Sequence, residues 1–322
     1  MRSWVLERWG TIDDLVLKQI DEPKPEAGEV LVKISHAGLN FADIIAVRGR
    51  YQVKVEPPFV LGSEFAGVVV DANGCTGFEP GDRVLGQVPS GAYAEYCAVD
   101  SARPVKLPDH LGFDRAATLP VSYTTAYIAL FAKGGLQPGQ TVLVHAAAGG
   151  LGLAAVQLAK WRGARVISTA GTPEKRALAL ANGSAAAIDY RQDGWLEEVR
   201  NAAPDGVDLV VDPVGGDITL KSIKLLNWGG RLLVCGFAGG APAAIPANHV
   251  LVNAISVVGV FWDFVRDRET VVSAQRELVE LAATDRLHLH IDRIVPMAEL
   301  KSGLEALNNA ETSGKVLLGV GL

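Results

Sequence analysis

The segment Val142-Leu143-Val144-His145-Ala146-Ala147-Ala148-Gly149-Gly150-Leu151-Gly152 joins an apolar strand to a glycine-rich turn and the start of a helix. At such a turn the backbone can approach a pyrophosphate without intervening Cβ atoms, and the helix start offers unpaired N–H groups and the positive end of its dipole. Ala147 takes the first position of the Gly-x-Gly-x-x-Gly pattern, so the match is partial. The turn predicts dinucleotide binding, with a purely structural turn as the alternative; its candidate cofactor residues are Ala146, Gly149, Gly150 and Leu151.

An alternation of strands and helices follows this turn along the chain. The apolar pattern predicts helices at 151–161, 173–181, 193–201 and 217–226, between strands at 141–145, 164–169, 185–189, 207–212 and 231–235. This order is typical of a doubly wound parallel sheet. A further strand is expected at 255–260, helices at 269–283 and around 297–307, and a final strand at 315–320.

The residues before about 120 have a different pattern. Short β-rich runs at 29–34, 67–70, 82–85 and 92–99 lie between Gly and Pro signals, which predicts a compact, mostly antiparallel β domain. The fold class is therefore α/β with two domains and a boundary near residue 120. Periodicity leaves open which of the two domains carries the segment after residue 262.

Composition and charge limit the classes of protein to which the chain can belong. Hydrophobic residues make up 49% of the 322 residues and charged residues 20%, which excludes global disorder. Lys and Arg number 30 against 36 Asp and Glu, and the net charge of -6 disfavours nucleic acid as a principal partner. Three separated cysteines and an N-terminal stretch without an apolar signal segment predict a cytoplasmic protein.

Two long stretches, 134–159 and 232–262, contain no Asp, Glu, Lys or Arg. Each has the length needed to cross a bilayer. Gly and Pro residues interrupt both, so they are expected to form buried strands, loops and helices, and no membrane partner is predicted.

The end of the second parallel strand carries information about the nucleotide. An NAD site places a carboxylate about 20 residues after the glycine turn, and Val166–Thr172 contains none. Lys175 and Arg176 instead begin the next helix, where they can neutralise a 2'-phosphate. NADP(H) is therefore favoured over NAD(H); the alternative is that both cations lie on a solvated helix face.

Motifs along nearly the whole chain resemble a known family: Gly38–Asp43, Leu61–Gly67, Gly81–Val84, Gly91–Tyr96, the Ala146, Gly149 and Gly152 turn, Asp189–Arg191, Asp212–Gly216 and Gly314–Val316. Together they are similar to the zinc-free NADPH:quinone oxidoreductase branch, which includes zeta-crystallin, of the medium-chain dehydrogenase/reductase superfamily. The resemblance implies a GroES-like catalytic domain at 1–120 and a Rossmann NADPH-binding domain at 121–262. It also implies that the segment 263–322 returns to the catalytic domain.

The resemblance also implies roles for particular residues. Lys175 and Tyr190, beside Gly171 and Thr172, would hold the 2'-phosphate of NADPH. The nicotinamide side would be lined by Thr125, Gly236, Phe237, Phe261 and Trp262. Asn40 would donate a hydrogen bond to the substrate, and Tyr51 would orient the substrate or supply a proton. Relatives often have a second Tyr where this chain has Ile45, so solvent is an alternative proton source.

The zinc ligands of related alcohol dehydrogenases correspond to Asn40 and Ser63, and neither residue is a plausible zinc ligand. His288 and His290 lack a third ligand nearby, so no metal is predicted. Hydride addition to a quinone or enone needs orientation and hydrogen bonds to oxygen rather than a Lewis acid, which predicts an NADPH-dependent reductase of such acceptors.

Two other functions stay open at this stage. One is an enoyl-thioester reductase, and the other is a non-catalytic nucleotide- or RNA-binding protein of the crystallin type. A homodimer is expected through the strand at 255–260, because relatives pair there and an unpaired apolar edge is prone to aggregate.

Overall fold

A computed structural model describes residues 1–321, so Leu322, the last residue of the predicted C-terminal segment, lies outside it. The described chain divides into two compact units. The first contains residues 1–121, 275–285 and 289–321, and the second contains residues 122–274 and 286–288. The first division lies one residue from the expected change near 120. The second unit continues to Ala274, so the unit boundary falls inside helix α9 (Arg268–Ala283) rather than at 262.

The first unit is built on two sheets. A seven-stranded sheet has the order β15-β16-β3-β5-β6-β8, with β7 paired to β3, and a three-stranded sheet has the order β2-β1-β4. All pairs are antiparallel except β15 with β16. The strands are β1 (Arg2–Leu6), β2 (Leu15–Gln19), β3 (Glu29–Leu39), β4 (Phe59–Val60), β5 (Glu64–Asp71), β6 (Arg83–Gln87), β7 (Tyr96–Asp100), β8 (Val105–Lys106), β15 (Ile291–Pro296) and β16 (Lys315–Gly319).

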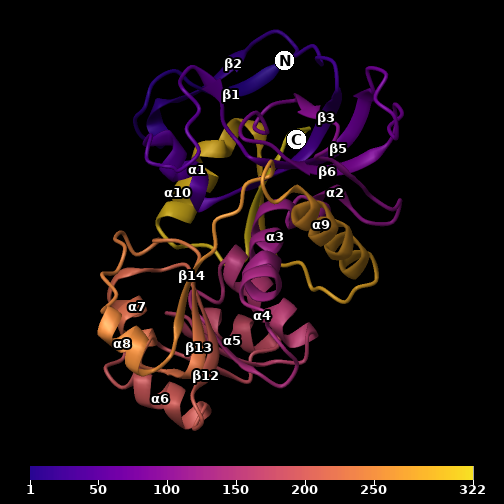
Figure 1. Ribbon diagram of the computed structural model, residues 1–322. Coiled ribbons are helices and arrows are strands. Elements are labelled where there is room, and N and C mark those ends of the chain that lie inside the picture. Colours follow the sequence, from indigo (N-terminus) through magenta and orange to yellow (C-terminus); the bar gives the residue numbers. More distant parts are fainter. Residues whose placement is uncertain (322) are drawn as a thin grey trace. The chain divides into compact units, whose positions relative to one another are not determined.

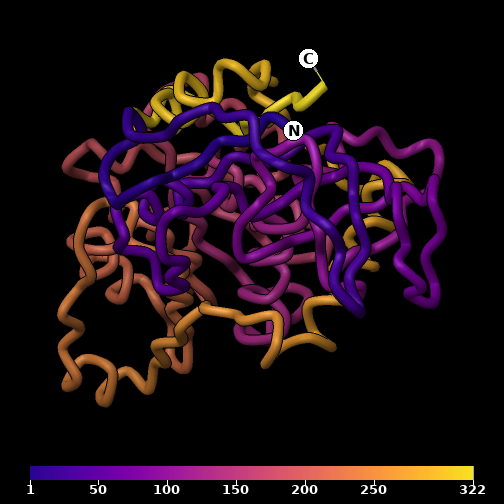
Figure 2. The backbone as a smooth tube through the Cα atoms, turned by 90° about the horizontal axis from the view of Figure 1, so that it is seen from above, coloured from indigo at the N-terminus to yellow at the C-terminus, as the bar shows by residue number. Residues whose placement is uncertain are grey.

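Helices α1 (Phe41–Val47), α2 (Phe113–Ala116) and α10 (Leu300–Asn308) accompany these sheets, together with the part of α9 that begins at Gln275. The alternating residues Val30, Val32 and Ile34 of β3 are buried in one core with Leu300 and Leu304 of α10. β16 pairs with β3 over Leu39 to His36, so the last strand lies inside the seven-stranded sheet, between β15 and β3. Figure 2 accordingly shows the yellow C-terminal end close to the indigo N-terminus. Residues 289–321 thus complete the first unit.

The second unit contains a six-stranded parallel sheet with the order β11-β10-β9-β12-β13-β14. Helices α4 and α5 lie on one side of its strands, and α7 and α8 lie on the other (Figure 1). The predicted combination of a β-rich unit with a doubly wound sheet is confirmed. The elements are α3 (Thr124–Tyr127), β9 (Thr141–Val144), α4 (Gly150–Trp161), β10 (Arg165–Thr169), α5 (Pro173–Ala181), β11 (Ala186–Ile188), α6 (Trp195–Ala202), β12 (Val207–Asp212), α7 (Gly216–Ser222), β13 (Leu226–Val234), α8 (Ala247–Val252) and β14 (Ser256–Gly259).

One predicted helix is shorter than expected, and the next strand is longer. Helix α7 ends at Ser222 instead of 226, and β13 begins at Leu226 instead of 231. Gly229 and Gly230 interrupt the apolar pattern of that strand, and its register with β12 shifts between Val207 and Leu209.

The two long uncharged stretches belong to the second unit. They contain β9 and α4, and β13, α8 and β14, respectively. Within residues 1–321, no helix has both the length and the apolar character needed to span a bilayer.

Candidate functional site

The glycine turn lies between β9 and α4, at the carboxyl end of the central strand of the parallel sheet. Ala146 has a φ of +48°, a left-handed conformation that is uncommon for a residue with a Cβ. Gly149 is the N-cap of α4 and offers no side chain to its amides. A Cβ at Gly152 would lie 2.2 Å from the Ala146 carbonyl oxygen, so only glycine fits there. The helix start therefore fits a pyrophosphate group.

His145 supports this turn from inside the unit. Its Nδ1 lies 2.8 Å from Thr169 Oγ1, and its Nε2 lies 2.7 Å from Ser222 Oγ. Ser222 Oγ donates to the Ile218 carbonyl oxygen, so it accepts the hydrogen bond from Nε2. Burial lowers the pKa of His145 to about 4, against the opposing effect of the Asp212 charge. His145 is therefore a neutral, packed residue.

The predicted 2'-phosphate residues gather where β10 ends and α5 begins. Thr172 is the N-cap of α5, and its hydroxyl accepts from the Lys175 backbone N–H at 3.3 Å. A Cβ added to Gly171 would lie 3.5 Å from both the Tyr190 hydroxyl and the Arg191 Nε. Gly171 therefore lies next to a phenol hydroxyl and a guanidinium group, two kinds of group that can bind a phosphate.

The structure places a carboxylate in this cluster to which the sequence analysis gave no role. Asp189 follows β11 and accepts two hydrogen bonds from the Arg191 guanidinium, each 3.0 Å long. Arg176 pairs with the same carboxylate at 2.9 Å. Burial alone would raise the pKa of Asp189, but the two cations hold it below its usual value. Both guanidinium groups therefore neutralise the negative charge of Asp189.

Two of the predicted nicotinamide residues are joined directly. The Trp262 indole N–H donates to Thr125 Oγ1 at 3.0 Å. Phe261 is exposed, and Phe237 lies against the backbone of Gly215. The loop that begins at Gly236 is held by the Ala238 N–H, which donates to the Pro213 carbonyl oxygen at 2.9 Å.

Asp212 organises the loops on which these residues lie, and the sequence analysis gave it no role. It is fully buried at the end of β12, and its Oδ1 accepts from the backbone N–H groups of Val214 and Gly215 at 2.8 and 3.1 Å. Its Oδ2 accepts from the Thr219 hydroxyl. The Asp-Pro-x-Gly-Gly pattern was the available signal, since an Asp before a turn commonly binds the amides that follow.

Asn40, the predicted substrate donor, lies in the first unit between two charged side chains. Lys315 Nζ donates to Asn40 Oδ1 at 2.9 Å, and Asn40 Nδ2 donates to Glu64 Oε1 at 2.7 Å. Lys315 and Glu64 are themselves paired at 2.5 Å and are 3% and 0% exposed. The remaining Nδ2 contact is a long one, 3.4 Å from the Gly38 carbonyl oxygen.

A buried carboxylate lies beside this group. Asp43 Oδ2 accepts from the Tyr93 hydroxyl at 2.6 Å and from the Asn40 backbone N–H at 2.8 Å, which also caps α1. Burial raises the pKa of Asp43 to about 6, although the Tyr93 hydrogen bond opposes the shift. Burial and then the Asp43 charge raise the pKa of Tyr51. The half-buried Tyr51 hydroxyl therefore keeps its proton at neutral pH.

The donors around Asn40 do not fit a zinc ion. Asn40 and Ser63 supply an amide and a hydroxyl, and the Ser63 hydroxyl faces Asp43 Oδ1 at 3.4 Å. Across residues 1–321, no group of three or more His, Cys, Asp or Glu side chains is placed to hold a metal.

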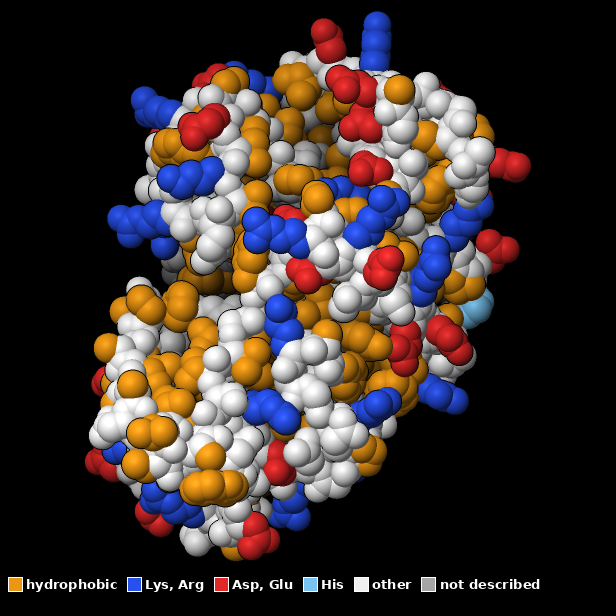
Figure 3. All heavy atoms as spheres, in the orientation of Figure 1, with side chains coloured by type: hydrophobic (Ala, Val, Ile, Leu, Met, Phe, Trp, Pro, Cys, Tyr) orange, Lys and Arg blue, Asp and Glu red, His pale blue; other side chains and the backbone are white. Residues whose placement is uncertain are grey.

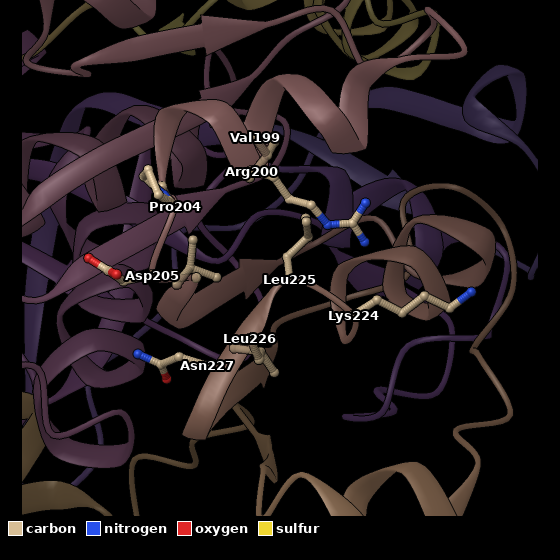
Figure 4. A pocket seen from close by; sticks show the side chains of 11 residues that line it. Val199, Arg200, Pro204, Asp205, Lys224, Leu225, Leu226 and Asn227 are labelled. Atoms are coloured by element: carbon tan, nitrogen blue, oxygen red, sulfur yellow. The ribbon is translucent and has the colours of Figure 1, made fainter.

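A separate cavity of about 230 Å³ lies at the amino ends of the parallel strands, where β12 and β13 begin. Arg200, Asp205, Lys224 and Asn227 are among the residues that line it (Figure 4). Ligands of doubly wound sheets bind at the carboxyl ends of the strands, so this cavity is not the predicted nucleotide site. Cations and carboxylates alternate over the face of the described residues seen in Figure 3, and that face carries no broad field of a single charge.

Comparisons with known proteins agree with this description. The model of the alcohol dehydrogenase GroES-like domain matches residues 26–109, and that of the zinc-binding dehydrogenases matches residues 150–279. Quinone oxidoreductase-like protein 2 of Bos taurus is 35% identical, over 95% of this chain and 89% of that protein. The synaptic vesicle membrane protein VAT-1 homolog of Homo sapiens is 33% identical, over 99% of this chain and 86% of that protein.

Solved structures of quinone oxidoreductases are also similar to this chain, in fold and in sequence. The Escherichia coli quinone oxidoreductase complexed with NADPH has a TM-score of 0.93 and 27% identity, covering 99% of this chain and 100% of that one. The quinone oxidoreductase of Thermus thermophilus, also solved with NADPH, has a TM-score of 0.86 and 36% identity with the same coverage.

Proposed function

Because this chain belongs to the quinone oxidoreductase-like branch of the medium-chain dehydrogenase/reductase superfamily, we propose that it is an NADPH-dependent reductase of quinones or α,β-unsaturated carbonyls. The observation that carries the proposal is the closeness of Gly171 to the Tyr190 hydroxyl and the Arg191 guanidinium, with Lys175 on the adjoining helix. Arg176 and Arg191 neutralise Asp189, the carboxylate of this cluster, and the phenol and the cations would bind a 2'-phosphate.

NADPH, when bound, supplies the hydride. The amides at Gly149, Gly150 and Leu151 would hold the pyrophosphate, with Ala146 shaping the turn. Thr172, Lys175 and Tyr190 would hold the 2'-phosphate. Thr125, Gly236, Phe237, Phe261 and Trp262 would position the nicotinamide.

Reduction of a quinone takes one hydride and one proton and leaves a hydroquinone. Asn40 would donate a hydrogen bond to the oxygen on which negative charge develops, and Tyr51 would donate its hydroxyl hydrogen. The raised pKa of Tyr51 keeps it a donor throughout the neutral range. Solvent is the alternative source of the proton. No step in this scheme uses a metal, so elemental analysis of active protein should find no stoichiometric zinc.

The test is the rate of NADPH consumption by purified protein with benzoquinones, naphthoquinones and enones, and with NADH as the comparison. We expect turnover with at least one of these acceptors and a preference for NADPH. Turnover only with crotonyl-type thioesters would replace the proposal with an enoyl-thioester reductase. Lack of turnover with every acceptor, in protein that binds NADPH, would refute a reductase.

We also propose a homodimer formed through the edge strand β14. Val257 on this strand is 41% exposed, and the adjoining α8 exposes Leu251 at 79%. Trp228, at the start of β13, is 78% exposed. An edge with unpaired backbone groups beside apolar side chains favours pairing with a second copy of the chain.

A further inference from the structure

Lys315 of β16 and Glu64 of β5 form a buried ion pair that the proposed chemistry does not use. Their remaining hydrogen-bonding groups are occupied. Lys315 Nζ donates to the Leu39 carbonyl oxygen at 3.1 Å, and Glu64 Oε2 accepts from the Val121 backbone N–H at 2.7 Å. Removing two charges from water costs free energy. Apolar residues of similar size in place of a buried ion pair commonly stabilise a fold equally well or better. Stability alone therefore gives little reason for the pair.

The pair determines the orientation of the Asn40 amide. The ammonium group faces the amide oxygen at 2.9 Å, and the carboxylate faces the amide nitrogen at 2.7 Å. Rotating the amide by a half turn would place its NH2 group against the ammonium and its oxygen against the carboxylate. Both contacts would then be repulsive in a site with a low dielectric constant. Only one orientation is therefore compatible with these neighbours.

This orientation leaves one amide hydrogen with a weak partner. Glu64 takes one Nδ2 hydrogen, and the other faces the Gly38 carbonyl oxygen at 3.4 Å, beyond the usual range for N–H···O bonds. That hydrogen can be given to a substrate at little cost.

Resting on the reductase function proposed above, we propose that Lys315 and Glu64 are positioning residues. They fix the Asn40 amide so that its second Nδ2 hydrogen donates to the substrate oxygen that becomes negative on hydride addition. Neither residue contacts the substrate. A donor held in place before the reaction lowers the barrier without reorganisation, so the pair acts on kcat more than on KM.

The principal test is the double variant Glu64→Gln with Lys315→Met, which removes both charges together and avoids a single uncompensated buried charge. We expect it to fold and to bind NADPH with unchanged affinity, measured by the fluorescence of the bound nucleotide. Its kcat should fall by about tenfold to a hundredfold while KM changes little, because the amide is no longer held in one orientation.

A second double variant, Asn40→Asp with Glu64→Gln, moves the carboxylate from position 64 to position 40. Lys315 keeps an anionic partner, and the amide introduced at position 64 can donate to that carboxylate. The buried polar groups therefore keep hydrogen-bond partners, and the variant should fold. Position 40 then has no side-chain N–H, and kcat should fall at least as far. This variant tests the donor role of Asn40, on which the positioning role depends, so wild-type kcat would overturn the inference even if the first variant does not fold.

The matched control is Arg83→Met in the same unit. Arg83 donates to the carbonyl oxygens of Pro108, Asp109 and Leu111 and has no contact with Asn40. The Arg83→Met variant should be less stable than the wild type but have the same kcat, which separates the effect of lost packing from the effect of lost positioning.

Crystal structures give a readout that does not depend on turnover. Asn40 should have one orientation in the wild type and more than one in Glu64→Gln with Lys315→Met. Failure of the reductase function would appear as an inactive wild type, and this readout would still test the positioning role. Wild-type kcat in either double variant, or a single unchanged Asn40 orientation in the first, would overturn the inference.

Discussion

Acidification should lower the stability of the second unit through protonation of His145, and the burial of this side chain sets the size of the effect. The pKa of His145 is 6.5 in the unfolded chain and about 4 in the folded protein, because burial penalises the cation. Between these values the unfolded chain binds more protons, so stability falls as the pH falls. The full effect of the 2.5-unit difference is about 3 kcal/mol, of which about 2 kcal/mol is lost between about pH 8 and about pH 5.

Asp43 has the opposite dependence and would hide this effect in the wild type alone. Its pKa is raised from 3.8 to about 6, so the folded protein holds the proton more tightly and gains stability as the pH falls through that range. The variant His145→Gln keeps Asp43 and removes the imidazole. The difference between the two proteins therefore isolates His145.

The assay is urea unfolding at several pH values, followed by tryptophan fluorescence. Trp195 is buried with its ring centroid 5.8 Å from that of His145, so it reports on the relevant unit. The stability advantage of the wild type over His145→Gln should shrink by about 2 kcal/mol from about pH 8 to about pH 5. His110→Gln, at an exposed site, should leave the wild-type pH dependence in place. An advantage that stays constant with pH would refute the reasoning.

Three other predictions test the nucleotide unit and its edge. Lys175→Ala should lower the affinity for NADPH by about tenfold to a hundredfold and the affinity for NADH little, since a charge-assisted bond to the 2'-phosphate is lost. Equal losses of affinity in titrations of the two nucleotides would place Lys175 outside the site. Gly152→Ala should cost at least about 2 kcal/mol in urea unfolding and abolish NADPH binding, because its Cβ would lie 2.2 Å from a backbone oxygen; a variant of wild-type stability would contradict this packing. Val257→Lys should shift the protein from dimer to monomer in sedimentation at micromolar concentration, because a charge would be buried at β14, and a dimer that persists would exclude this edge.

The sequence was informative wherever structure depends on neighbours along the chain. The alternation after Thr141 predicted the parallel sheet because each strand and helix has its own local period. The glycine turn was recognisable because its backbone must pass close to other atoms, as the contact of Gly152 with Ala146 shows. The absence of a carboxylate at the end of β10 was likewise visible in one short segment.

The charged groups inside the molecule could not be predicted in this way. Glu64 and Lys315 are 251 residues apart, and a charged residue is by default assigned to the surface because few are buried unless paired. The pairing of Asp189 with Arg176 is a similar case, since it depends on how α5 and the segment after β11 lie beside each other. Local pattern determined the glycine turn and most strands and helices of the parallel sheet. Only tertiary structure decided which charges meet, because a buried ion pair depends on distance in space and leaves no period in the sequence.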